Sequence, residues 1–111
     1  MSIEHVDVAE GHARVEGGAL LLDVREQHEW DGGHAPDAVH VILGELPARV
    51  GELPTDRPIV VVCKAGGRSA MATEALVGAG FDAVNLAGGM LAWAAAGLPC
   101  VTDSGGPGAV V

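Results

Sequence analysis

The residue best placed for chemistry is Cys63, which follows an uncharged, β-branched run at residues 59–62. A free cysteine has a pKa of about 8.5, so it is mostly a thiol at neutral pH. Lys64 comes directly after it, Arg68 stands five residues on, and a helix is expected to begin near Arg68. Because nearby cations and a helix N-terminus both lower the pKa of a thiol, the sequence predicts a reactive thiolate at Cys63.

The loop after the cysteine is also suited to binding an anion. Gly66 and Gly67 lack the Cβ atoms that would keep backbone N–H groups from turning inward, so the loop can form a nest of amides. The alternative is a buried structural cysteine that closes a core strand. We favour the functional interpretation, because an inert cysteine is rarely set beside two cations and a glycine pair.

The spacing between Cys63 and Arg68 separates two classes of thiol chemistry. Phosphatases of the tyrosine-phosphatase kind place the arginine one residue further from the cysteine, so that their loop encloses a phosphoryl group. The shorter span in this chain gives a tighter ring of amides. We therefore expect a cavity that suits one sulfur atom on the cysteine better than a phosphate.

Composition indicates one compact domain. The chain has 111 residues, 49% of them hydrophobic, and we expect a single domain over residues 1–111, with its core at about 8–103 and a flexible, glycine-rich tail at 104–111. The net charge of −9 argues against a nucleic-acid partner, which would need a basic face.

No apolar run is long enough to span a bilayer and the N-terminus lacks a secretory signal, so we expect no membrane partner and a cytoplasmic location.

The remaining candidate metal and redox residues are scattered. The two cysteines, Cys63 and Cys100, are far apart and no Cys/His cluster has zinc spacing, so we expect neither a metal nor an organic cofactor. The five histidines, together with Glu26 and Glu29, are interpreted as surface or loop residues. Cys100 is interpreted as a small core residue, with a resolving thiol that reacts with Cys63 as the alternative.

Strands and helices alternate along the chain. Short apolar runs predict strands at 19–24, 39–43, 59–63 and 82–88, and helical periodicity with Gly or Pro stops predicts helices at 7–17, 45–53, 68–79 and 89–97. Residues 25–38 are expected to form a loop with at most one helical turn. This order predicts an α/β fold with a mainly parallel sheet, in which ligands bind beyond the carboxyl ends of the strands, where Cys63 lies.

Three segments together resemble a single-domain rhodanese of the rhodanese-like sulfurtransferase family. They are "LLDVREQHEWDGGHAPDAVHV" (21–41), "CKAGGRS" (63–69) and "NLAGGMLAWAAAGLP" (85–99). They occur in the family's order over nearly the whole chain. The resemblance implies a five-stranded parallel sheet flanked by helices on both faces. It also implies an enzyme of the thiosulfate sulfurtransferase type, in which Cys63 takes a sulfane sulfur as a persulfide and passes it to cyanide or a thiol.

The resemblance also implies roles for the site residues, with Cys63 as the nucleophile. The residues that would bind the donor and stabilise the persulfide are Lys64, Ala65, Gly66, Gly67 and Arg68. Of these, the two cations would favour an anionic donor such as thiosulfate. The residues that would form a scaffold around the site are Asp23, Arg25 and Ser69. Asp23 ends an apolar strand, where a carboxylate needs polar partners.

Two other functions remain open. The first is a relay or binding module that delivers persulfide sulfur to a protein partner, with thiosulfate acting only as a surrogate. The second is a small cysteine phosphatase or arsenate reductase, which the short span between Cys63 and Arg68 disfavours.

Overall fold

The computed structural model, which describes residues 2–111, is built on a five-stranded sheet in which every pair of neighbouring strands is parallel. The strands lie in the order β1-β5-β4-β2-β3. Their bounds are His5–Val6 (β1), Leu20–Asp23 (β2), Val39–His40 (β3), Ile59–Val62 (β4) and Ala83–Leu86 (β5). The predicted α/β fold with a parallel five-stranded sheet is confirmed, although the third strand is shorter than expected.

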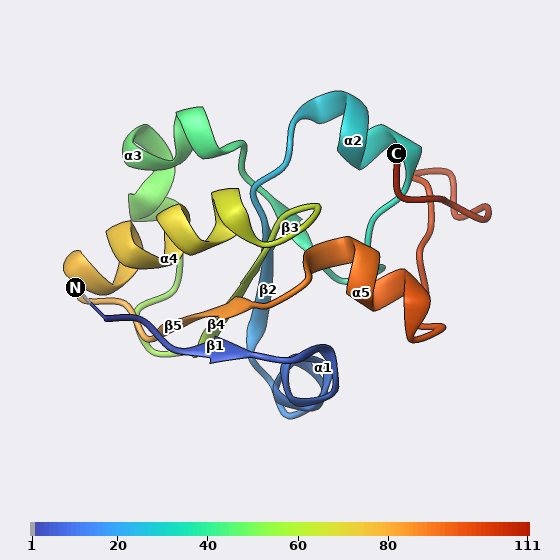
Figure 1. Ribbon diagram of the computed structural model, residues 1–111. Coiled ribbons are helices and arrows are strands. Elements are labelled where there is room, and N and C mark those ends of the chain that lie inside the picture. The colour runs from blue at the N-terminus through green and yellow to red at the C-terminus, as the bar shows by residue number, and fades with distance from the viewer. Residues whose placement is uncertain (1) are drawn as a thin grey trace.

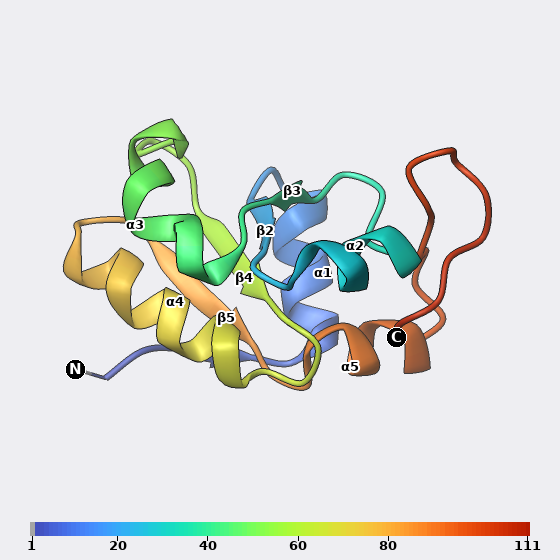
Figure 2. The ribbon, with the colours of Figure 1, turned by 90° about the horizontal axis from the view of Figure 1, so that it is seen from above.

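Helices cover both faces of the sheet. The α-helices are α1 (Val8–Glu16), α2 (Gln27–Gly32), α3 (Leu46–Arg49), α4 (Gly67–Gly78) and α5 (Gly89–Ala95), and two 3₁₀ turns flank α3, η1 (Leu43–Glu45) and η2 (Val50–Glu52). Figure 1 shows α3 and α4 on one side of the sheet and α1 on the other, and Figure 2 gives the view turned by 90°. Within residues 2–111, no helix combines the length and the apolar character needed to cross a membrane.

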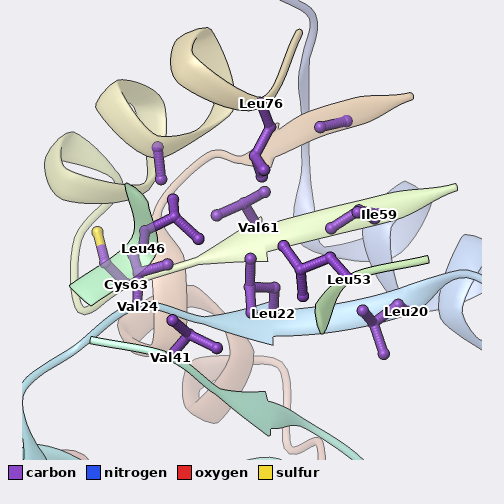
Figure 3. Close-up of a cluster of buried hydrophobic side chains, with 12 residues drawn as sticks. Leu20, Leu22, Val24, Val41, Leu46, Leu53, Ile59, Val61, Cys63 and Leu76 are labelled. Carbon is purple, nitrogen blue, oxygen red and sulfur yellow. The ribbon is translucent and has the colours of Figure 1, made fainter. Parts of the chain in front are cut away.

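Alternation along the central strands divides the core into two clusters. Successive side chains of a strand point to opposite faces, so a continuous apolar run supplies both. In β4, Ile59 and Val61 belong to the cluster under α3 and α4, whereas Val60 and Val62 belong to the cluster under α1 and α5. Cys63 continues the first set, and Figure 3 shows its sulfur at the end of that cluster, beside the labelled aliphatic side chains. The alternation therefore sends the cysteine side chain toward the face that carries α4.

Two features of the helices follow from local chemistry. Pro47 lies in the first turn of α3, where its missing N–H costs no helical hydrogen bond. Gly80, just beyond the C-cap of α4, has a φ of +95°, a conformation that L side chains rarely adopt. The segment expected as a loop with at most one helical turn contains α2, which has six residues.

The C-terminal segment follows a defined path back toward α2, as Figure 1 shows. The backbone N–H of Ala109 donates to the carbonyl of Gly32 at 2.9 Å, and Val101 forms an antiparallel bridge with His34. Hydrogen bonds therefore join this segment to the end of α2. The mobility expected for residues 104–111 remains a prediction.

The first turn of α5 packs directly against the loop that carries Cys63. The backbone N–H groups of Met90 and Leu91 donate to the carbonyls of Cys63 and Lys64 at 2.8 and 3.0 Å. Gly89 allows this approach, because it has a φ of +57° and a Cβ atom there would lie 2.5 Å from the carbonyl oxygen of Lys64. The glycine thus sets how closely α5 can support the loop.

We predict that Gly89→Ala destabilises the fold by about 3 kcal/mol or more, because backbone strain and the clash with the loop add together. Gly80→Ala is the matched control, since φ is also positive there but nothing lies within 4 Å of the added Cβ. We expect it to cost only about 1 kcal/mol. Urea unfolding of both variants measures the difference, and equal losses would show that close packing of α5 on the loop contributes nothing.

Candidate active site

The Cys63 side chain is buried next to hydrogen-bond donors at the carboxyl end of β4. The residue is 1% exposed. The backbone N–H of Gly66 lies 3.1 Å from Sγ, and the Ser69 hydroxyl lies 3.2 Å from it. Gly66 has a φ of +115° and caps α4, whereas Gly67 and Arg68 already belong to the first turn of that helix. The positive φ of Gly66 is what turns this amide toward the sulfur.

Hydrogen bonds make Cys63 more acidic than an ordinary thiol. Burial alone would raise its pKa, because it disfavours the charged form. The Ser69 hydroxyl and the backbone N–H groups of Ser69, Gly66 and Ala65 outweigh burial, so the pKa of Cys63 is lowered. From the sequence we expected this lowering from neighbouring cations and from the N-terminus of the following helix. The backbone N–H groups at the start of α4 agree with the second cause, whereas no cation is among the main contributions.

Behind the sulfur lies a polar chain that the sequence analysis did not predict. The Ser69 hydroxyl is 2.6 Å from Asn85 Oδ1, and Asn85 Nδ2 is 3.0 Å from His5 Nδ1 and 3.3 Å from the Gly66 carbonyl. Asn85 is 3% exposed and Ser69 is fully buried. A polar residue within the apolar strand at 83–86 was the available signal, of the same kind that singled out Asp23.

Arg68 is engaged by a carboxylate from α2. Its Nη1 donates to Glu29 Oε1 at 2.6 Å and its Nη2 to Glu29 Oε2 at 2.9 Å, in a two-pronged contact. Glu29 is 6% exposed, so the interpretation of this residue as a surface charge was wrong. The error has a physical reason: 39 positions separate the two residues in sequence, and only the fold brings them together. Glu26, the other carboxylate in that interpretation, is exposed.

Glu29 is ionised at all ordinary pH values. The hydrogen bonds from Arg68 are the main cause that lowers its pKa to about 2, against burial, which acts to raise it. The backbone N–H of Glu26 adds a further hydrogen bond to Oε1 at 3.0 Å. The carboxylate is therefore held from α2 itself as well as from the loop.

Lys64 differs from Arg68 in its surroundings. It is half-buried, and within residues 2–111 it forms no ion pair. Its backbone carbonyl accepts a hydrogen bond from the backbone N–H of Leu91. Within residues 2–111, its ammonium group has no carboxylate partner. The two cations that the sequence analysis treated alike are thus electrostatically different.

Asp23 and Arg25 form a fully buried ion pair that joins β2 to α2. Arg25 donates to both carboxylate oxygens of Asp23, with a shortest distance of 2.7 Å from Nη2 to Oδ2. Its Nη2 also donates to the carbonyl of Gly33 at 2.9 Å, and His40 Nε2 lies 2.7 Å from the Arg25 carbonyl. Neither residue is among the hydrogen-bond donors to the sulfur, and their role as a scaffold for the site stays a prediction.

The model of the family described as rhodanese-like domain matches residues 7–96. The chain belongs to this rhodanese-like domain family. A sulfurtransferase of Allochromatium vinosum is 41% identical over 87 residues, 78% of this chain and 81% of the relative. The thiosulfate sulfurtransferase GlpE of Pseudomonas syringae pv. syringae is 39% identical over 79 residues, 70% of this chain and 74% of the relative. A solved structure of a rhodanese-related protein from Thermoplasma volcanium has a TM-score of 0.85 at 29% identity and covers 90% of this chain and 99% of that one.

The histidines of this rhodanese-like domain are only partly the surface residues that we expected. His34 is 5% exposed and stacks on Trp30 with ring centroids 3.6 Å apart, and His40 stacks on the same ring at 4.7 Å. His34 lies in the loop between α2 and β3, as one form of the expectation had it, but its ring is buried rather than on the surface and lies 3.4 Å from Asp103. In the described part of the chain, no three metal-ligating side chains come together.

The two cysteines of the rhodanese-like domain lie on opposite faces of the sheet. Cys63 belongs to the cluster under α4, whereas Cys100 packs against the cluster under α5. Burial raises the pKa of Cys100, which makes it a poorer nucleophile at neutral pH. Both observations favour Cys100 as a packing residue over a resolving thiol.

We predict that Ser69→Ala raises the pKa of Cys63, because it removes the side-chain hydrogen bond that stabilises the thiolate. Alkylation by iodoacetamide, followed against pH, should then reach its half-maximal rate at a higher pH than in the parent. Ser69→Thr keeps the hydroxyl and should restore the parent profile. Identical profiles for the parent and the alanine variant would contradict the assignment.

We predict that the Glu29–Arg68 pair makes stability depend on acid. The pKa of Glu29 is lowered in the folded state from 4.5 to about 2, so its contribution is complete above pH 4.5 and is lost as the pH falls toward 2. Because the Arg68 side chain is 34% exposed, we discount the contribution to about 2 kcal/mol. Urea unfolding at about pH 6 and at about pH 3 should show a smaller pH effect in Glu29→Gln than in the parent. Asp31→Asn on the same helix should behave like the parent.

Proposed function

We propose that this rhodanese-like domain is a sulfurtransferase of the thiosulfate sulfurtransferase type, which moves a sulfane sulfur from an anionic donor such as thiosulfate to cyanide or a thiol. The observation that carries the proposal is the sulfur of Cys63, enclosed by the Gly66 amide and the Ser69 hydroxyl. The names of the sulfurtransferase relatives support it. Both cysteines are free, which suits a reducing compartment such as the cytoplasm.

In the first half-reaction, the Cys63 thiolate attacks the outer sulfur of thiosulfate. A sulfur–sulfur bond forms to Cys63, the bond between the outer sulfur and the sulfonate group breaks, and sulfite leaves with the electron pair. The product is a Cys63 persulfide. Donors already aimed at Sγ, the Gly66 amide and the Ser69 hydroxyl, would stabilise the negative charge on the persulfide. The unmatched Lys64 ammonium would attract the anionic donor.

In the second half-reaction, cyanide or a thiolate attacks the terminal sulfur of the persulfide. The sulfur–sulfur bond to Cys63 breaks, the Cys63 thiolate leaves with the electron pair, and thiocyanate or a new persulfide departs. The chemistry is ping-pong, because the donor product leaves before the acceptor reacts. No residue other than Cys63 needs to change its covalent bonds.

A relay to a protein thiol is the second candidate, and two exposed apolar side chains favour it. Leu91 is 48% exposed on the first turn of α5, whose backbone is bonded to the Cys63 loop, and Met71 is 62% exposed near the start of α4. An exposed apolar side chain on a helix that is hydrogen-bonded to the Cys63 loop, as Leu91 is, suits contact with a protein acceptor. We propose this acceptor as the alternative to a small thiol.

A phosphatase or arsenate reductase activity has less support. Such an enzyme would use the arginine fork of its loop to hold the oxygens of its substrate. In this chain both prongs of Arg68 are already on Glu29. Hydrolysis of a phosphate ester without any sulfur gain is therefore the result that would contradict sulfur transfer.

We predict that incubation with thiosulfate adds one sulfur atom to the protein, and that cyanide then removes it. Intact mass spectrometry before and after each step measures both changes. Cys63→Ser should show no gain, because it lacks the accepting thiolate, and Cys100→Ser should gain and lose sulfur like the parent. If the parent gains no sulfur but hydrolyses an aryl phosphate, sulfur transfer is wrong.

A further inference from the structure

Glu29 alters the charge that an incoming molecule meets at Cys63. The carboxylate engages both prongs of Arg68 and is itself almost fully buried. An ion pair in this geometry presents a dipole, whose field falls off faster with distance than that of a single charge. Arg68 therefore attracts an anion much less than its formal charge would indicate.

A census of the six cations shows how little free positive charge remains. Four arginines, Arg14, Arg25, Arg49 and Arg68, form ion pairs with carboxylates. Arg57 donates to the carbonyl of Gly18, which precedes β2. It therefore lies at the amino ends of the strands, whereas Cys63 lies at their carboxyl ends. Within residues 2–111, Lys64 is the one cation at the carboxyl ends of the strands that has no carboxylate partner.

The Glu29 carboxylate has a contact at the start of its own helix in addition to those with Arg68. Its Oε1 accepts from the backbone N–H of Glu26, and its own backbone carbonyl faces Arg25 Nη1 at 3.4 Å. The Arg68 side chain is the more exposed partner, at 34% against 8% for Glu29. A donor anion could replace Glu29 on Arg68 only by leaving a nearly buried carboxylate without its cation, which is costly.

We propose that Glu29 is a specificity-determining residue, which neutralises Arg68 and thereby limits the preference of the Cys63 site for doubly charged over singly charged sulfur donors. The proposal rests on the proposed function for its substrate class, since it concerns donors of sulfane sulfur. Lys64 then supplies the attraction for anions alone. The parent site should accept monoanionic donors, such as thiosulfonates, at a smaller disadvantage to thiosulfate than a site with a free Arg68 would.

A pair of alkylating reagents tests the electrostatic part without sulfur transfer. Iodoacetamide is neutral and iodoacetate carries one negative charge. In both cases the Cys63 thiolate forms a bond to the methylene carbon and iodide leaves with the electron pair. The ratio of their rate constants does not depend on the thiolate fraction, so a changed pKa of Cys63 cancels. Both rates are measured on Cys100→Ser backgrounds by intact mass.

We expect Glu29→Gln to raise the ratio of the iodoacetate to the iodoacetamide rate by roughly threefold to tenfold, as removal of one charge at this range predicts. Arg68→Gln should lower the ratio, because it leaves Glu29 unmatched. The double variant should return close to the parent. Asp31→Asn, which removes one exposed charge from the same helix, should leave the ratio unchanged. If Glu29→Gln does not fold, Arg68→Gln and the double variant can be compared instead. They differ only in the Glu29 charge, so the double variant should show the higher ratio.

A ratio in Glu29→Gln equal to that of the parent, or an equal rise in Asp31→Asn, would overturn the proposal. The donor preference is then measured directly, as the rate of sulfur gain from thiosulfate relative to benzenethiosulfonate, which releases benzenesulfinate in place of sulfite. Glu29→Gln should raise this ratio. A shifted alkylation ratio without any sulfur gain would overturn the proposed function and keep the role of Glu29. Sulfur gain together with an unshifted alkylation ratio would keep the proposed function and overturn the role of Glu29.

Discussion

A guanidinium group without contact to water needs acceptors for its N–H groups, and Arg25 is such a group. It finds them on Asp23 and on two backbone oxygens in and just after α2. A shift of α2 would leave buried guanidinium N–H groups without acceptors, so Arg25 ties this helix to β2. The same helix carries Glu29, which engages the Cys63 loop through Arg68. The Cys63 loop is thus contacted by a helix that Arg25 in turn holds against β2.

The parts of the site that depend on neighbouring residues could be predicted from sequence. The apolar run at 59–62, the glycine with positive φ and the helix beginning just after it all follow from local chemistry, and they place Cys63 correctly. Glu29 could not be assigned in this way, because its partner lies 39 positions away. The sequence marks Asn85 only as a polar residue in an apolar strand, and its partner Ser69, 16 positions away, could not be named. A carboxylate in a polar segment looks solvated until the fold buries it. The family motifs supplied the strand number, which periodicity alone could not give.

Under the proposed function, the acidity of the thiol and the attraction of a donor would arise from different groups. Neutral hydrogen-bond donors stabilise the thiolate at short range, and salt in the solvent screens such contacts little. Under the proposed function, the attraction of an anionic donor would depend on the partly exposed Lys64, whose charge salt does screen. In a protein with a net charge of −9, this separation keeps Cys63 reactive while the long-range field works against anions.

The Ser69 hydroxyl carries one hydrogen but has two acceptors within reach, Asn85 Oδ1 at 2.6 Å and Cys63 Sγ at 3.2 Å. While Cys63 is a thiol, its S–H can donate to the Ser69 oxygen as Ser69 donates to Asn85. Once Cys63 is a thiolate, Ser69 can turn its hydrogen to the sulfur. The protein can accommodate the gain or loss of charge on the sulfur by rotation of the Ser69 hydroxyl about its Cβ–Oγ bond. The reorganisation that ionisation demands is thereby reduced to the movement of one hydrogen atom, with every heavy atom already in place.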